Sequence, residues 1–268
     1  MPETCLLVFD FDGVICNSFY DSLMTAINTY MEIVPDHSLP MESPLKFSDI
    51  VQFEKNNREF CRQFRDLMPF GNFAKDYYVI LNIMGKNLFD KIQSQKDFDV
   101  FVKTCSQEHI KEYQNLFYKI RYEMQENNPE QWANLLPAFP GIPEAIRQLS
   151  QKFMLAIATS KDKRSVNILL KKYGIESYFK KENILDKDFA KSKREHITTF
   201  SKMYSIDFSR IYFIDDKLLH LVSVSDLGIN LYLAEWGFNT KREHYQAIEY
   251  GFELLHSSDL IKLKCSKK

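Results

Sequence analysis

The sequence predicts an α/β fold in which a parallel-sheet domain carries an inserted helical domain. Short, continuous apolar runs occur near both ends of the 268-residue chain, and such runs are typical of strands buried on both faces. Between them, long polar segments carry aromatic residues at helical spacing. We therefore expect a discontinuous sheet domain of residues 1–17 and 136–268, and a helical domain of residues 18–135.

The predicted strands come in an order that is typical of a parallel sheet. The first apolar run, residues 5–9, precedes the helical domain, and three more follow it at residues 153–158, 211–214 and 229–234. Each later run follows a segment with helical character, and strands that alternate with helices form parallel sheets with right-handed crossovers. The helical segments of this domain are residues 143–151, 163–173 and 195–204.

The inserted domain is predicted to be helical from the spacing of its aromatic residues. Four apolar residues share one side of a helical wheel, within about 60° of each other, and are expected to pack in a core. They are Phe53, Phe60, Phe64 and Leu67. On the opposite side, Arg58, Arg62 and Arg65 are expected to form a solvated face, with binding of an anionic substrate as the alternative. Further helices are expected at residues 19–33, 77–87 and 98–126.

Composition argues against several classes of protein. With 35 basic and 36 acidic residues the net charge is −1, so no global basic field favours nucleic acid or an anionic membrane. The apolar run at residues 5–9 is too short for a signal peptide or a membrane span. The five cysteines are odd in number and widely scattered, which favours reduced thiols. We expect a cytoplasmic protein without nucleic-acid or membrane partners.

Acidic and hydroxyl side chains come directly after three of the predicted strands. In chain order they are Asp10, Asp12, Thr159, Ser160, Asp215 and Asp216. Ligands of open α/β sheets bind outside the carboxyl ends of the strands, so these side chains are expected to share one crevice. Clustered carboxylates need a cation, and oxygen ligands suit Mg2+. A metal ion beside a free carboxylate favours attack on a phosphoryl group.

These segments resemble the motifs of the haloacid dehalogenase-like (HAD) superfamily. Residues 8–15 (VFDFDGVI) resemble its first motif, residues 156–161 (AIATSK) its second, and residues 213–216 (FIDD) its acidic fourth. Residues 139–179 are similar to the phosphoglycolate phosphatase type of member. The resemblance implies a Rossmann-like parallel sheet with helices on both faces and an inserted all-helical cap.

The resemblance also implies a role for individual residues. Asp10 would be the nucleophile that forms an aspartyl-phosphate, and Asp12 the general acid and base. Thr159, Ser160 and Lys191 would bind the substrate phosphate. Because Asp12 would protonate the leaving oxygen, the resemblance favours a phosphatase or a phosphomutase over a dehalogenase.

The lysine and the metal ligands are the least constrained parts of this site. Lys187 and Lys193 are rivals to Lys191 for the place beside the phosphate. The metal ligands that the resemblance implies are Asp10, Asp12, Asp215 and Asp216. Family members often carry a further acid four or five residues after the first acid of the fourth motif, where this chain has Leu219 and His220.

The predicted function is Mg2+-dependent hydrolysis of a small phosphomonoester, a phosphorylated metabolite, through an aspartyl-phosphate. This makes the protein a HAD-like phosphoric monoester hydrolase. One alternative is a phosphomutase, which would use the same aspartates and pass the phosphoryl group to a second hydroxyl. The other is a non-catalytic protein that binds phosphate or a partner on the same scaffold. The substrate's identity and the oligomeric state are left open.

Overall fold

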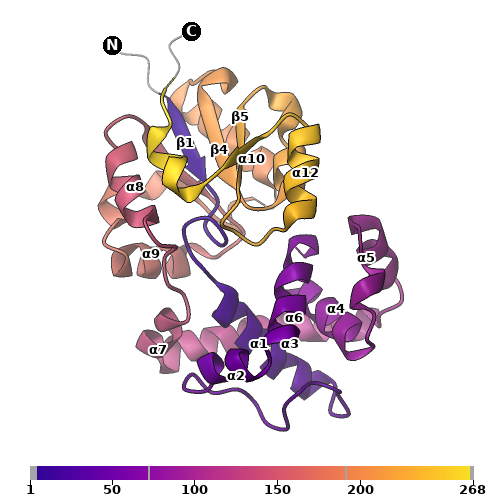
Figure 1. Ribbon diagram of the computed structural model, residues 1–268. Helices are drawn as coiled ribbons and strands as arrows, with labels where there is room; N and C mark the ends of the chain where they lie inside the picture. The colour runs from indigo at the N-terminus through magenta and orange to yellow at the C-terminus, as the bar shows by residue number, and fades with distance from the viewer. Residues whose placement is uncertain (1–4, 72, 191, 266–268) are drawn as a thin grey trace. The chain divides into compact units, whose positions relative to one another are not determined.

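The computed structural model describes residues 5–71, 73–190 and 192–265. The chain divides into two compact units (Figure 1). The sheet unit comprises Met1–Asn17 and Pro137–Lys268, and the helical unit comprises Ser18–Leu136. The second crossing between the units thus lies one residue beyond the expected position.

The sheet unit contains six parallel strands, and the predicted α/β fold is confirmed. The strands are β1 (Leu6–Phe9), β2 (Met154–Ala158), β3 (Ile184–Leu185), β4 (Ile211–Asp215), β5 (Asn230–Ala234) and β6 (Glu253–Leu255), in the order β3-β2-β1-β4-β5-β6. All four residues of β1 are buried, as its continuous apolar sequence predicts. The short edge strands β3 and β6 were not among the predicted runs. Two or three residues are too few for a recognisable pattern.

Strand register brings the ends of the three central strands together. Phe9, the last residue of β1, pairs with Ile157 of β2 and with Ile214 of β4. Because the strands are parallel, the residues that follow them emerge at one edge of the sheet. The polar residues predicted to converge therefore start from neighbouring positions.

Helices cover the sheet and complete its core. They are α8 (Ile142–Leu149), α9 (Lys163–Lys172), α10 (Lys193–Tyr204), α11 (Leu218–Val222) and α12 (Lys241–Glu249). Ile197 and Phe200 of α10 pack with Leu6 and Val8 of β1 in one buried cluster. Short 3-10 helices lie at Glu176–Tyr178, Lys181–Asn183, Phe208–Arg210, Ser225–Leu227 and Ser257–Lys262.

The helical unit is built around stacked aromatic rings. Its helices are α1 (Phe19–Ile33), α2 (Ile50–Asn56), α3 (Arg58–Leu67), α4 (Ala74–Gly85), α5 (Gln95–Val102), α6 (Gln107–Asn127) and α7 (Pro129–Asn134), with 3-10 helices at Met68–Phe70 and Phe89–Lys91. The Tyr77 ring lies 5.6 Å from that of Phe64 and 5.5 Å from that of Phe117. Among described residues, no helix is both long and apolar enough to cross a bilayer.

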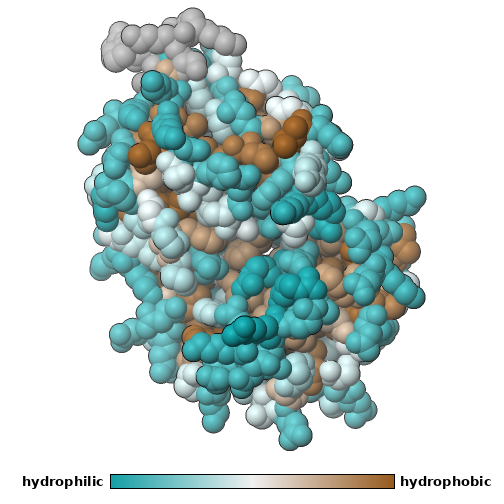
Figure 2. All heavy atoms as spheres, viewed as in Figure 1, coloured by the Kyte–Doolittle hydropathy of each residue, from teal (hydrophilic) through white to brown (hydrophobic). Residues whose placement is uncertain are grey.

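The predicted arginine face is occupied by ion pairs. Arg62 contacts Glu59 and Asp66, each at 2.6 Å. Arg65 contacts Glu54 at 2.9 Å. Hydrophilic side chains cover much of the visible face of this unit (Figure 2). Arg62 and Arg65 are thus engaged on the surface and Arg58 is exposed, as the solvated-face interpretation expects. The ion pairs add little to stability.

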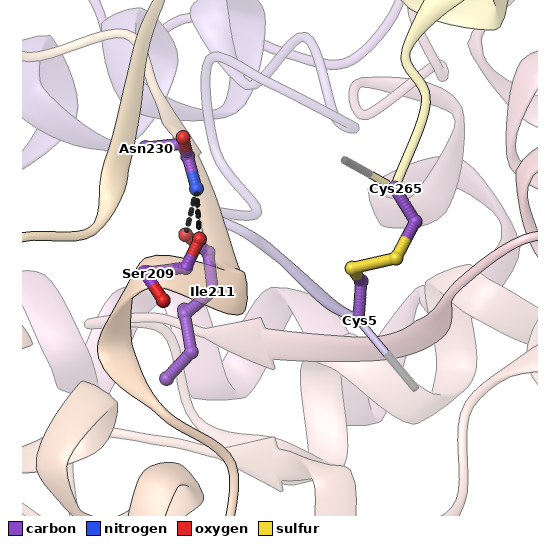
Figure 3. Close-up of a disulfide and its surroundings, with 5 residues drawn as sticks. All are labelled: Cys5, Ser209, Ile211, Asn230 and Cys265. Carbon is purple, nitrogen blue, oxygen red and sulfur yellow. Dashed lines mark hydrogen bonds between the residues drawn. A yellow bond between two sulfur atoms is a disulfide. The ribbon is translucent and has the colours of Figure 1, made fainter. Parts of the chain in front are cut away.

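A disulfide joins the two ends of the sheet unit, contrary to the expectation of reduced thiols. Cys5, just before β1, is bonded to Cys265 across a sequence separation of 260 residues (Figure 3). On a neighbouring part of the sheet, the Asn230 side chain donates hydrogen bonds to the carbonyls of Ser209 and Ile211. Spacing along the chain detects close cysteine pairs only, so it missed a pair that folding brings together.

Candidate active site

The loop after β1 is held in a tight conformation that presents Asp10 at the sheet edge. The Asp10 amide continues the β ladder by donating to the Ile214 carbonyl at 2.9 Å. The amides of Ile15 and Cys16 both donate to the Phe11 carbonyl at 2.9 Å. Phe11 in turn donates its amide to Asp10 Oδ1 at 2.7 Å. The carboxylate is therefore oriented by the backbone of its own loop.

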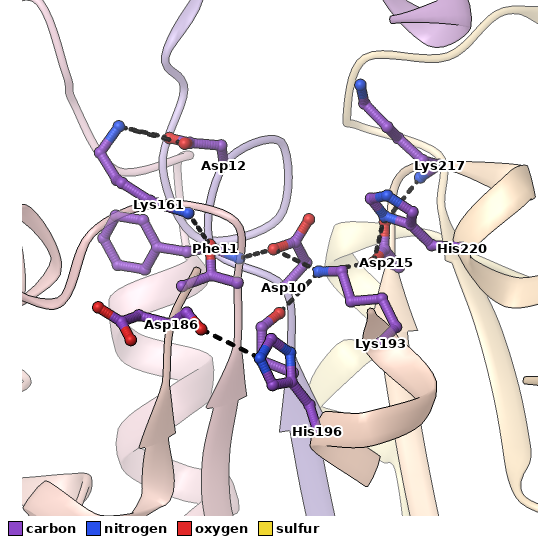
Figure 4. Close-up of polar contacts among 12 residues, drawn as sticks. Asp10, Phe11, Asp12, Lys161, Asp186, Lys193, His196, Asp215, Lys217 and His220 are labelled. Atoms are coloured by element: carbon purple, nitrogen blue, oxygen red, sulfur yellow. Dashed lines mark hydrogen bonds and ion pairs between the residues drawn. The ribbon is translucent and has the colours of Figure 1, made fainter. Parts of the chain in front are cut away.

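Lys193 lies between Asp10, the predicted nucleophile, and Asp215, a predicted metal ligand (Figure 4). Its Nζ is 2.8 Å from Asp10 Oδ1 and 3.2 Å from Asp215 Oδ2. It also donates to the carbonyl of Ala158, the last residue of β2, at 2.7 Å. The lysine side chain is only 4% exposed, so these contacts are made almost without solvent screening. One ammonium thus connects the ends of the three central strands.

The electrostatics of this group favour a further cation. Burial and the nearby Asp215 charge raise the pKa of Asp10, although Lys193 opposes the rise. Burial would lower the pKa of Lys193, but the two carboxylates outweigh it and raise the pKa. The carboxylates of Asp10 and Asp215 and the ammonium of Lys193 together carry one net negative charge, and all three side chains are buried. A divalent cation would remove that deficit, and carboxylate oxygens are suitable ligands for one.

His220 joins the acids at this point, although it is not among the predicted site residues. From α11 its Nδ1 lies 3.0 Å from both carboxylate oxygens of Asp215 (Figure 4). Burial would raise the pKa of Asp215, but His220 and Lys193 hold it well below its usual range. Ligand atoms of Asp10, Asp215 and His220 lie within 4.8 Å of one another. This donor set could hold a metal ion.

Asp216 is engaged by the loop that follows β5. Its Oδ2 accepts a hydrogen bond from the Phe238 amide at 2.8 Å. Glycines pack closely around it, because a Cβ at Gly13 would lie 2.1 Å from Asp216 Oδ2 and one at Gly237 would lie 2.2 Å from its Cβ. Burial, together with the charges of Asp215 and Asp10, raises the pKa of Asp216. Asp216 thus connects two loops and is not in the converging donor set of the described residues.

Asp12 is paired with a lysine from the loop after β2. Lys161 Nζ lies 3.1 Å from both carboxylate oxygens of Asp12. The Lys161 side chain is 1% exposed, whereas that of Asp12 is 32% exposed. The Lys161 amide donates to Thr159 Oγ1 at 3.1 Å, which holds the buried hydroxyl near this loop. Asp12 is therefore the accessible acid of the pair Asp10 and Asp12, and Ser160 is exposed.

The lysine beside the nucleophile position is one of the rivals named from the sequence. Lys193 contacts Asp10, while the first choice, Lys191, lies outside the described residues. Lys193 is the first residue of α10. The N-cap before it is Ser192, and the Ser192 side chain accepts a hydrogen bond from the Glu195 amide. The capping pattern Ser-x-x-Glu was the signal that could have located the start of this helix.

Comparisons with known proteins give the family of the chain. A family model of haloacid dehalogenase-like hydrolases matches residues 6–220. No curated protein sequence matches the chain closely enough to count as a relative.

Solved structures share the fold across nearly the whole chain. A haloacid dehalogenase-like family protein from Streptococcus pneumoniae superposes with a TM-score of 0.60 at 16% identity, covering 98% of this chain and 99% of that one. A predicted phosphoglycolate phosphatase from Haemophilus somnus gives 0.62 at 16% identity, covering 98% of each chain. A predicted phosphatase from Clostridium acetobutylicum gives 0.59 at 13% identity, covering 97% of each. Together with the match over residues 6–220, this fold places the chain in the haloacid dehalogenase-like hydrolase family.

Proposed function

We propose that this protein is a phosphatase that hydrolyses a small phosphomonoester through an aspartyl-phosphate on Asp10, with Mg2+ as its cation. The observation that carries the proposal is the buried group formed by Asp10, Lys193 and Asp215, with Lys193 Nζ 2.8 Å from Asp10 Oδ1. Membership of a hydrolase family and the phosphatase names of two structural neighbours support it.

In the first step, Asp10 attacks the substrate phosphorus. A carboxylate oxygen of Asp10 forms the new P–O bond, while the bond to the leaving oxygen breaks and Asp12 donates a proton to that oxygen. The orientation of Asp10 by the Phe11 amide supports its role as the attacking group. Thr159 and Lys193 are suited to bind the phosphoryl oxygens, because a hydroxyl and an ammonium stabilise the charge that develops there.

In the second step, Asp12 accepts a proton from water as the water oxygen attacks phosphorus and the bond to Asp10 breaks. The partial exposure of Asp12, 32% of its side chain, supports this exchange of protons with leaving group and water. Ser160 and Lys191 keep their predicted roles in phosphate binding; Lys191 lies outside the described residues.

The cation would be held by Asp10 and Asp215, and by Asp12, which the resemblance also implies as a ligand. When bound, a divalent cation neutralises charge on the transferring phosphoryl oxygens. The convergence of ligand atoms within 4.8 Å supports a cation here. The ligand role predicted for Asp216 stays a prediction. Its Oδ2 accepts a hydrogen bond from the Phe238 amide.

The test is release of inorganic phosphate from a panel of phosphomonoesters, with and without MgCl2. We expect metal-dependent release by the wild type, and at least about a thousandfold loss in Asp10→Asn, because loss of a covalent nucleophile removes the catalytic step itself. Asp259→Asn, an acid on the 3-10 helix Ser257–Lys262 paired with Lys262, is the matched control and should retain activity. Full activity of Asp10→Asn would refute the mechanism.

The same assay separates the two alternatives. A phosphomutase would move the phosphoryl group to an added sugar hydroxyl without net release of phosphate. A binding protein would take up the cation and release phosphate from no ester in the panel.

A further inference from the structure

We propose that His220 supplies a nitrogen ligand to the cation held by Asp10 and Asp215, which raises the affinity of the site for Mn2+ relative to its affinity for Mg2+. This inference rests on the proposed function, because it concerns the cation of the same site. It goes further by assigning a ligand outside the predicted set and by deriving a metal preference from it.

The position of the imidazole is the first argument. His220 Nδ1 faces the Asp215 carboxylate at 3.0 Å from both oxygens (Figure 4). Two adjacent ligands of an octahedral cation, each about 2.1 Å from the metal, are about 3.0 Å apart. The separation seen between Nδ1 and the carboxylate is therefore also the separation that a shared cation requires.

The backbone around His220 holds the ring in this position. The His220 amide donates to the Lys217 carbonyl at 3.0 Å, and the Lys217 amide donates to Asp215 Oδ1 at 2.9 Å. Lys217 therefore links His220 to the Asp215 carboxylate through the backbone of the turn from β4 into α11. With 16% of its side chain exposed, His220 is mostly buried beside Asp215. Such an arrangement reduces the entropy lost when a ligand is fixed on a metal.

The chemistry of the donors is the second argument. Asp10, Asp215 and His220 offer two carboxylates and one imidazole, with ligand atoms within 4.8 Å of one another. Mg2+ is a hard ion that binds oxygen and is reluctant to lose water. Mn2+ accepts the same oxygen ligands as Mg2+, and as a first-row transition ion it tolerates a nitrogen donor better than Mg2+ does. An imidazole in the set therefore shifts the preference from Mg2+ toward Mn2+.

The competing interpretation is that His220 only donates a hydrogen bond to Asp215. In that case the ring orients the carboxylate, and the cation has no nitrogen ligand. Both interpretations predict that substitution of His220 weakens metal binding. They differ in whether nitrogen couples to the metal and in whether the preference between Mn2+ and Mg2+ changes.

The experiment is pulsed electron paramagnetic resonance of Mn2+ added to the full-length protein, combined with calorimetric titration of Mn2+ and of Mg2+. We expect a nitrogen coupling to Mn2+ in the wild type and its loss in His220→Asn. The affinity for Mn2+ should fall about tenfold or more, since loss of even an outer-shell partner costs ten- to a hundredfold in metal affinity. The affinity for Mg2+ should fall less, so that the ratio of Mn2+ to Mg2+ affinity decreases. His220→Asp, which restores an oxygen donor, should lower the ratio while retaining Mg2+ binding.

Two further variants make the result decisive. His256→Asn is the matched control, because His256 contacts Glu235 and not the acids of the site, and it should keep the wild-type coupling. Asp215→Asn should abolish binding of both cations. If the wild type binds Mn2+ without nitrogen coupling, or if His220→Asn keeps both coupling and ratio, the inference is wrong while the metal site of the proposed function stands. If the wild type binds neither cation, both are wrong.

Discussion

Replacing Lys193 by methionine should destabilise the protein strongly in the absence of metal. The change removes the ion pairs with Asp10 and Asp215 and the hydrogen bond to the Ala158 carbonyl, which are 2.8, 3.2 and 2.7 Å long. Methionine has a similar length and volume, so no cavity is created. The loss therefore comes from two buried carboxylates without their ammonium, and breaking such a pair costs about 3–5 kcal/mol.

The assay is urea unfolding followed by circular dichroism at neutral pH, with EDTA present. Lys191→Met serves as the comparison, because sequence reasoning assigned that lysine the same place. We expect a loss of about 3–5 kcal/mol for Lys193→Met and a smaller loss for Lys191→Met, because Lys193 is the lysine that contacts Asp10. Excess Mg2+ should restore part of the Lys193→Met stability, because binding to the native state adds to the free energy of unfolding.

The deficit of Lys193→Met should also depend on pH. In the wild type, burial and Asp215 already raise the pKa of Asp10, and Lys193 opposes them. Without the lysine this pKa rises further, so the folded variant holds a proton that the unfolded chain has released. Its stability is then retained at acidic pH and falls as pH rises through the folded-state pKa. A deficit below about 1 kcal/mol at neutral pH, or a larger one for Lys191→Met, would refute the reasoning.

Three other perturbations test the surroundings of the site. Gly13→Ala should lower the free energy of unfolding by about 1–3 kcal/mol more than Gly228→Ala does, measured by thermal unfolding. Both glycines have positive φ, but of the two only Gly13 faces the Asp216 carboxylate. Equal losses for the two variants would contradict the clash. Asp216→Asn should change the free energy of unfolding by less than about 1 kcal/mol, since burial already favours its neutral form. Calorimetric titration with Mn2+ tests its predicted ligand role, which unchanged affinity in this variant would contradict. Cys265→Ser should cost about 2–4 kcal/mol under oxidising conditions and nothing under reducing ones, measured by urea unfolding.

The fold was predictable because its strands are buried on both faces. The sequence LLVF of β1 has no polar face, and all four of its residues are buried. A strand that is apolar on both faces is typical of the interior of a parallel sheet. Strand register then places Asp10 and the acids after β4 at one edge. Edge strands such as β3 carry too few residues for this argument, so they became visible only in the structure.

The choice among the lysines could not be made from composition or spacing. Lys187, Lys191 and Lys193 lie within seven positions of one another, and each could reach a phosphate from a loop. The start of α10 at Lys193 decides which ammonium meets Asp10. His220 was missed for a related reason: five residues after Asp215, its direction depends on how the chain turns from β4 into α11.

The distribution of charge explains how this sheet edge tolerates so many acids. The acids are Asp10, Asp12, Asp215 and Asp216. Lys161 pairs with Asp12, and Lys193 is shared by the two acids that it bridges. Burial raises the pKa of Asp216 and so favours its neutral form. One negative charge remains uncompensated, on the side where His220 lies. A divalent cation there would make the site net positive, and a positive site is what a phosphate dianion requires.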